Sequence, residues 1–134
     1  MSLEQCRDWI LDVAESMPMV RRTIVYGESA NAYPMILAYP ASGTFSSMDV
    51  AKNHTMGTHT LLVEIQFPID QISKSMDDAI CSVGEFLKAF KDKELAKGVS
   101  IKQSPTYTFG EHSAYQNKST YGPIFTVVLS SEDR

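Results

Sequence analysis

Apolar and polar residues follow two different periods along the chain, and these periods divide it into expected helices and strands. Near the N-terminus, apolar residues recur every three or four positions, which predicts an amphipathic helix over residues 3–16. Pro18 favours an end to this helix, because a proline disfavours the helical conformation of the residue before it. A second stripe of the same period predicts a helix over residues 71–91. Its expected apolar face consists of Ile72, Met76, Ala79, Ile80, Val83, Leu87 and Phe90.

Alternating patterns and short apolar runs predict five strands. They are residues 23–26, 35–39, 59–67, 99–103 and 124–129. We expect the first two to pair as a hairpin, because their connection is too short for a helical crossover. The order α-β-β-β-α-β-β predicts an α+β fold, with an antiparallel or mixed sheet of about five strands and two main helices packed on it. A chain of 134 residues is expected to form a single domain over 1–134.

Two polar stretches separate the predicted elements, at about 41–58 and 105–122. Connections longer than about 12–15 residues without secondary structure are uncommon in compact domains. They are either mobile hairpin tips or loops whose large side chains become ordered against a partner, and their length favours the partner. The predicted contact residues are Phe45, Met48, Val50 and Lys52 on the first stretch, and Tyr107, Phe109 and Tyr115 on the second.

The composition restricts the functional classes. There are 12 Lys and Arg against 16 Asp and Glu, a formal net charge of −4, and this balance argues against a protein whose main work is to grip nucleic acid or an anionic membrane. The chain has no signal-peptide pattern and no apolar run approaching the ~18 residues that span a bilayer. Cys6 and Cys81 lack metal or redox spacing, so both are expected to be reduced thiols in the core.

Candidate chemistry along the chain is sparse. His54, His59 and His112 match no zinc-binding spacing. The segment around Ser29 begins like a nucleophile elbow, but Asn31 occupies the position of the second glycine. We therefore predict no catalytic, cofactor-binding or metal-binding residues.

The whole layout resembles a known family. An N-terminal helix is followed by a short strand pair that includes residues 33–39, a long polar loop, a strand like 59–65, a long helix and two closing strands. This arrangement resembles the tail terminator, or tail completion, proteins of long-tailed bacteriophages. The resemblance covers nearly the whole chain and depends on element order, length and the character of the strands and loops.

The resemblance implies a structural virion protein that caps the head-proximal end of the tail tube and joins tail to head. It implies assembly in the host cytoplasm into a ring, commonly a hexamer, at the head-tail interface. The implied partners are the tail tube protein and a head-completion or connector protein, with no membrane. DNA would pass through the ring without specific binding, and an acidic protein suits that role because dense Lys and Arg contacts would hold a polyanion.

Two other interpretations remain open. The chain could be a small cytoplasmic enzyme or ligand-binding domain with a pocket near His59, Glu64 and His112. It could also be an adaptor that is unrelated to phage assembly. Alanine substitutions at the three pocket residues discriminate the first of these from a structural role, because only an enzyme or binding domain depends on them.

Overall fold

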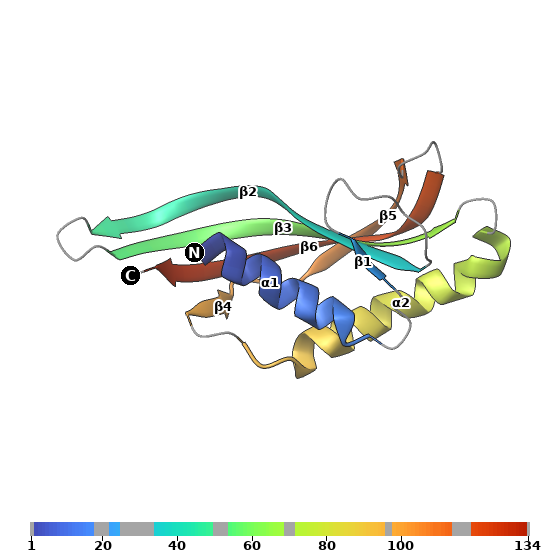
Figure 1. The fold of residues 1–134 in the computed structure, drawn as a ribbon, viewed down its shortest axis with the longest axis horizontal. Coiled ribbons are helices and arrows are strands. Elements are labelled where there is room, and N and C mark those ends of the chain that lie inside the picture. The colour runs from blue at the N-terminus through green and yellow to red at the C-terminus, as the bar shows by residue number, and fades with distance from the viewer. Residues whose placement is uncertain are drawn as a thin grey trace.

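The structure, a computed structural model, describes residues 2–17, 22–24, 34–49, 54–68, 72–95, 98–113 and 119–133. Within these ranges the chain forms two helices and six strands, arranged as one sheet with both helices along one side (Figure 1). The elements are α1 (Ser2–Glu15), β1 (Arg22–Ile24), β2 (Met35–Asp49), β3 (His54–Pro68), α2 (Ile72–Asp92), β4 (Val99–Ile101), β5 (Thr106–Ser113) and β6 (Ser119–Asp133). This arrangement confirms the predicted α+β class with two main helices.

The sheet has the strand order β1-β2-β3-β6-β4, and β5 also pairs with β6. β1 runs parallel to β2, whereas all other described neighbours are antiparallel, so the sheet is mixed. The predicted hairpin between 23–26 and 35–39 is therefore wrong, because those two strands run in the same direction. β3 lies between β2 and β6 and is paired on both sides for most of its length.

The polar stretch 41–58 is mostly strand, which corrects the predicted loop. β2 continues to Asp49 and β3 already begins at His54, with register shifts between Pro40 and Ser42 and between Phe45 and Ser47. Residues 50–53 lie outside the described part of the chain. The physical reason is that ladder hydrogen bonds join backbone groups, so a strand with little helix cover needs no apolar face.

The second predicted loop, 105–122, contains a strand that the sequence patterns did not indicate. Thr106–Ser113 forms β5, and β6 begins at Ser119; residues 114–118 are outside the described part of the chain. β5 pairs with the first half of β6 from Thr106 opposite Thr126 to Ser113 opposite Ser119. Its Thr, Tyr and Phe residues suit a half-covered strand, but intervening Gly, Glu and His residues hide the alternation.

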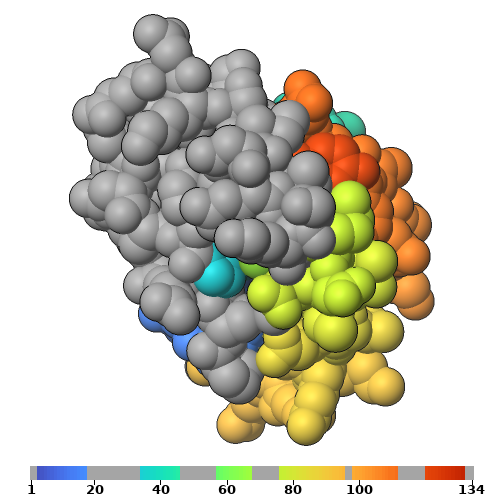
Figure 2. All heavy atoms as spheres, turned by 90° about the vertical axis from the view of Figure 1, so that its right-hand side faces the viewer, coloured from blue at the N-terminus to red at the C-terminus, as the bar shows by residue number. Residues whose placement is uncertain are grey.

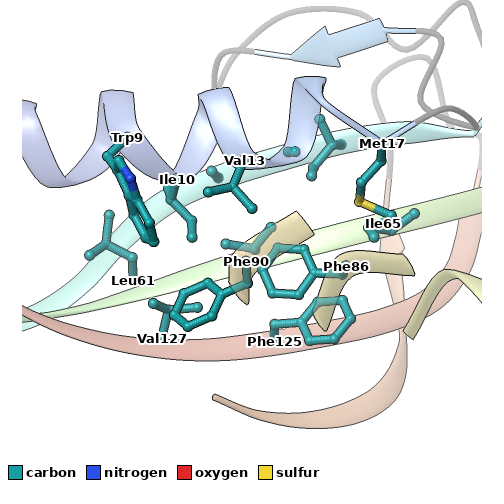
Figure 3. Packing of buried hydrophobic residues seen from close by; sticks show 14 of the residues in the cluster. Trp9, Ile10, Val13, Met17, Leu61, Ile65, Phe86, Phe90, Phe125 and Val127 are labelled. Atoms are coloured by element: carbon teal, nitrogen blue, oxygen red, sulfur yellow. The ribbon is translucent and has the colours of Figure 1, made fainter. Parts of the chain in front are cut away.

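The core lies between the two helices and one face of the sheet (Figure 3). α1 buries a stripe at helical spacing that includes Trp9, Ile10 and Val13, and the sheet contributes alternate residues of β2, β3 and β6. From α2, Phe86 stacks on Phe125 with ring centroids 4.1 Å apart and also lies near Phe90. Burial of such large rings is the main stabilising contribution available to a chain of this size.

The rotation of α2 about its axis differs from the prediction. Ala79, Phe86 and Phe90 face the core, whereas Ile80 is 56% exposed and Leu87 is also exposed. Residues 79, 86 and 90 define a narrower stripe than the predicted one, and Ile80 lies about 100° away from Ala79 because each helical residue turns by that angle. The neighbouring Cys81 is exposed, so its predicted place in the core is wrong, whereas Cys6 is buried as predicted.

At Gly122, β6 lies so near β3 that there is no room for a side chain. The ladder between these strands runs up to the pair Glu64 and Ile124 and resumes at Phe67 and Tyr121. A Cβ atom at Gly122 would lie 1.9 Å from the carbonyl oxygen of Ile65, far inside any normal contact distance. Only glycine fits here while the two strands keep their present separation.

Candidate interaction surface

The far halves of β2 and β3, residues 42–49 and 54–60, form a projection that we call the arm. Figure 1 shows β2 and β3 running past the N-terminal end of α1, beyond the helices that cover the rest of the sheet. Residues 40–45 are consecutively exposed, although the strand is still paired with β3 on its inner side. Six adjacent exposed residues in a strand mean that neither of its faces is covered by much of the protein.

Phe45 is the most exposed large apolar residue of the described side chains. It is 70% exposed and lies opposite Gly57 of β3, on the same side of the sheet as the core. A Cβ atom built on Gly57 would lie 3.5 Å from the Phe45 ring, so the ring lies against bare backbone. An exposed aromatic ring at the margin of the helix layer is the kind of group that anchors protein interfaces.

The base of the arm holds a buried histidine. The imidazole of His59 lies between two glycines: Cβ atoms built on Gly43 and Gly57 would each lie 2.9 Å from one of its ring nitrogens. Its Nε2 atom is 3.2 Å from the Ser131 hydroxyl oxygen, and the Cys6 thiol of α1 also hydrogen-bonds to Ser131. This chain of contacts joins the arm, the end of β6 and the first helix.

The two ionisable groups of this cluster are held in their neutral forms. Burial lowers the pKa of His59 below its ordinary value of 6.5, because the charged imidazolium loses water. Burial raises the pKa of the Cys6 thiol above 9.0, and the hydrogen bond with Ser131 offsets part of that effect. A buried thiol with a raised pKa is a poor nucleophile, since the thiolate is the reactive form.

A second polar cluster lies on the opposite face of the sheet. The Tyr39 hydroxyl donates a hydrogen bond to one oxygen of Glu64, at 2.5 Å, and Gln66 Nε2 donates to the other at 3.3 Å. The Thr120 hydroxyl in turn donates to the side-chain oxygen of Gln66 at 2.9 Å. Glu64, Gln66 and Thr120 are all buried, so this network ties β2, β3 and β6 together.

The pocket considered around His59, Glu64 and His112 does not assemble. His59 and Glu64 are five residues apart on one continuous strand, and an odd separation directs their side chains to opposite faces. His59 meets Ser131, whereas Glu64 meets Tyr39 and Gln66. The backbone of His112 pairs with Thr120 in β5, and its side chain is outside the described part of the structure.

Of the other residues predicted on the first polar stretch, Met48 lies on β2 near the end of the arm. Met48 pairs with Thr55 in the ladder, and its side chain is not among those described. Val50 and Lys52 lie outside the described residues. Of the four residues predicted for this interface, Phe45 is therefore the one whose side chain the structure describes.

The aromatic residues of the second stretch form a ladder along β5 and β6. Tyr107 is 54% exposed and makes an edge contact with Phe109, at 5.9 Å between centroids. Phe109 packs against the core and stacks on Tyr121 at 6.0 Å. Tyr107 is thus more available to a partner than Phe109, and Tyr115 is outside the described residues. In Figure 2 the orange atoms of residues 98–111 and the yellow atoms of α2 occupy the same visible face.

The sequence patterns predicted a strand at 99–103 but did not indicate that it would form part of the surface. In β4, Ser100 is exposed and Ile101 is 40% exposed. The glycines of the arm were also missed as a feature. Both glycines are visible in the polar stretch 41–58 of the sequence, but their positions on either side of the His59 ring depend on the register of β2 and β3.

Over the described residues, His, Cys, Asp and Glu side chains form no group of three or more that could hold a metal ion. Neither described helix has the combined length and apolar character needed to cross a bilayer.

Comparisons with protein-family models and with curated proteins found no match to this chain.

Proposed function

We propose that this chain is a structural virion protein that caps the head-proximal end of a long-tailed phage tail tube and joins tail to head. In this proposal it acts as a ring, commonly a hexamer, around the DNA channel. Its partners are the tail tube protein and a head-completion or connector protein. The α+β fold, with two helices on one face of a mainly antiparallel sheet, supports the proposal at the level of fold class. The long polar loop of the layout from which the resemblance was drawn is mostly strand, in β2 and β3.

The observation that carries the proposal is the arm with its exposed Phe45. The β2 strand adds little to the core of its own chain along residues 40–45, since these residues are exposed. It also carries a large ring that is 70% exposed. Such a projection is suited to contact a neighbouring subunit or the end of a tube, where burying the ring would contribute about 1.5–3 kcal/mol.

The charge of the chain supports passage of DNA without binding. Sixteen acidic residues exceed twelve basic ones, and nonspecific DNA affinity depends on phosphate contacts with Lys and Arg. The described polar side chains at the base of the arm hydrogen-bond within their own cluster. Those on the opposite face of the sheet hydrogen-bond within theirs. These hydrogen bonds stabilise the sheet of the proposed ring subunit.

The test is binding to tube ends. Wild-type protein mixed with purified tail tubes is expected to appear as a ring at one end in electron micrographs and to restore infectivity to tails that lack it. Phe45→Asp is expected to abolish both effects while the protein remains folded by circular dichroism. Ile80→Asp is the matched control, because Ile80 is another exposed apolar residue but lies on α2.

Two results would contradict the proposal. Wild-type protein that never occupied tube ends and never restored infectivity would reject the tail function as a whole. Full activity of Phe45→Asp would reject the arm as the contact while leaving the tail function standing.

A further inference from the structure

Over the described residues, both outer edges of the sheet lack a partner strand at the same level. Among the described residues, β2 pairs with β1 only at residues 35–37, so its outer edge has no partner strand along the arm. At the opposite edge of the sheet, β4 pairs with β6 and has no described strand along its outer edge. An open edge presents unpaired backbone donors and acceptors, which is a template for another strand.

The strand registers place these two edges on three shared rows. Each row crosses the sheet from β4 through β6 and β3 to β2, with one residue from each strand. The rows are Val99–Ser131–Gly57–Phe45, Ser100–Ser130–Thr58–Thr44 and Ile101–Leu129–His59–Gly43. The outer edge of β4 and the outer edge of β2 in the arm are therefore the two ends of the same rows.

We propose that a second copy of this chain adds its β4 edge to the β2 edge of the arm. The pairing places Gly43, Thr44 and Phe45 of one copy opposite Ile101, Ser100 and Val99 of the next. Three antiparallel steps separate β2 from β4, so β4 runs opposite to β2. A copy added in the same orientation thus makes an antiparallel pair, the stronger of the two kinds.

The side chains on the two edges are complementary. Ile101, which is 40% exposed, comes to lie beside Gly43, which has no side chain to oppose it. Phe45 comes to lie beside Val99 on the same face of the sheet, and Thr44 meets Ser100 on the other face. Cross-strand apolar pairs and Thr–Ser pairs each contribute roughly 0.2–1 kcal/mol.

Charge also favours contact through these rows. Each copy has a net charge of −4, so two copies repel one another across much of their surfaces. The three rows contain no Asp, Glu, Lys or Arg, and their single titratable residue, His59, is buried at the centre of the sheet. The copies can therefore approach along this edge without placing like charges opposite each other.

This contact uses two different edges, so each copy keeps one edge free for the next. Such a heterologous contact generates a ring if the rotation closes and an open filament if it does not. A three-row contact is smaller than the roughly 1,200–2,000 Å² of a stable pair interface, so association of free copies is expected to be weak. The inference rests on the proposed function for ring closure, and it names the strands that make the ring.

Disulfide trapping tests the pairing. The variant Thr44→Cys/Ser100→Cys, made in a Cys81→Ser background, places both new thiols on exposed strand positions. Within one copy the two positions are separated by three strand spacings, roughly 14 Å, which is too far for a disulfide. Directly opposite residues of paired strands are about 4.5–5.5 Å apart, which a disulfide can join. Mild oxidation at high protein concentration is therefore expected to give a ladder of oligomers that collapses on reduction.

The single-cysteine variants and one displaced pair are the controls. Neither Thr44→Cys nor Ser100→Cys alone is expected to form the ladder, because the contact joins unlike edges. Thr44→Cys/Thr108→Cys is expected to remain monomeric, because Thr108 lies on the row of Leu37 and not of Thr44. Circular dichroism and thermal melting establish that every variant is folded, and Ile101→Asp added to the first pair is expected to eliminate its ladder.

The outcomes separate this inference from the proposed function. No ladder from the first pair, dimers from Thr44→Cys alone, or a ladder from the displaced pair would each overturn the pairing, even if wild-type protein capped tail tubes. A ladder from the first pair without binding to tube ends would support the pairing and reject the tail function.

Discussion

The Nε2 atom of His59 lies 3.2 Å from the hydroxyl oxygen of Ser131, and this contact joins the base of the arm to the end of β6. The same hydroxyl hydrogen-bonds to the Cys6 thiol of α1. Because the imidazole is buried between two glycines, the fold favours its neutral form. Acid should therefore weaken the connection between the arm and the helix layer.

The first prediction concerns pH. The pKa of His59 is lower in the folded protein than its value of 6.5 in the unfolded chain, so the unfolded chain binds more protons below that pH. The contribution of neutral His59 to the free energy of unfolding is fully present above pH 6.5. It decreases as the pH falls through that value towards the pKa of His59 in the folded protein. Thermal melting between pH 8 and pH 5 should show a decreasing melting temperature.

His59→Gln is the matched variant for this pH dependence. It keeps a polar side chain near Ser131 but cannot be protonated in this range. Its melting temperature should change less between pH 7 and pH 5.5 than that of the wild-type protein. An equal change of melting temperature with pH in the two proteins would show that groups other than His59 cause the acid sensitivity.

The second prediction compares two glycines. Gly122→Ala should destabilise the protein by about 3 kcal/mol or more, because the new methyl group would collide with the carbonyl oxygen of Ile65. Gly84→Ala should stabilise it by about 0.5–1 kcal/mol, because nothing lies within 4 Å of the new Cβ atom in a helical position. Urea unfolding measures both. A tolerated alanine at position 122 would mean that β3 and β6 separate easily there.

The third prediction concerns the aromatic core. Phe86→Ala should lower the free energy of unfolding by about 3–5 kcal/mol, because it removes a fully buried ring that stacks on Phe125. Phe45→Ala should change it by no more than about 0.5 kcal/mol, because Phe45 is mostly exposed. A large loss of stability in Phe45→Ala would indicate that the arm ring supports its own chain and is not reserved for a partner.

The fourth prediction concerns the buried network around Glu64. Tyr39→Phe removes the hydroxyl that donates to the Glu64 carboxyl group and should cost about 1–3 kcal/mol. Tyr107→Phe serves as the control, since that tyrosine is exposed and should change stability little. Equal unfolding free energies for wild type and Tyr39→Phe would show that water replaces the lost hydrogen bond without cost.

Much of the fold could be predicted from local patterns. Residues 59–67 alternate because one face of β3 meets the helices, and the predicted helices at 3–16 and 71–91 correspond to α1 and α2. The polar strands could not be predicted in this way. Residues 42–49 and 106–113 have few apolar residues at the period of a strand, so their pairing depends on the partner strands alone.

The candidate surface illustrates the same division. The sequence marked Phe45 and Tyr107 as large groups in polar stretches, and both are exposed in the fold. It gave no indication that Phe45 and Val99 would lie on one row, because they are far apart in the chain and are related through β3 and β6. It also suggested a pocket with His59 and Glu64, which the alternation of a single strand separates.

By itself, the sequence determined the two helices, the apolar face of β3 and the acidic balance of the chain, because these follow from local periodicity and composition. The tertiary structure decided the parallel placement of β1, the length of the arm, the rotation of α2 and the close approach at Gly122. These features depend on contacts between residues distant in sequence, where backbone hydrogen bonds and steric fit select one register among many that the local pattern allows.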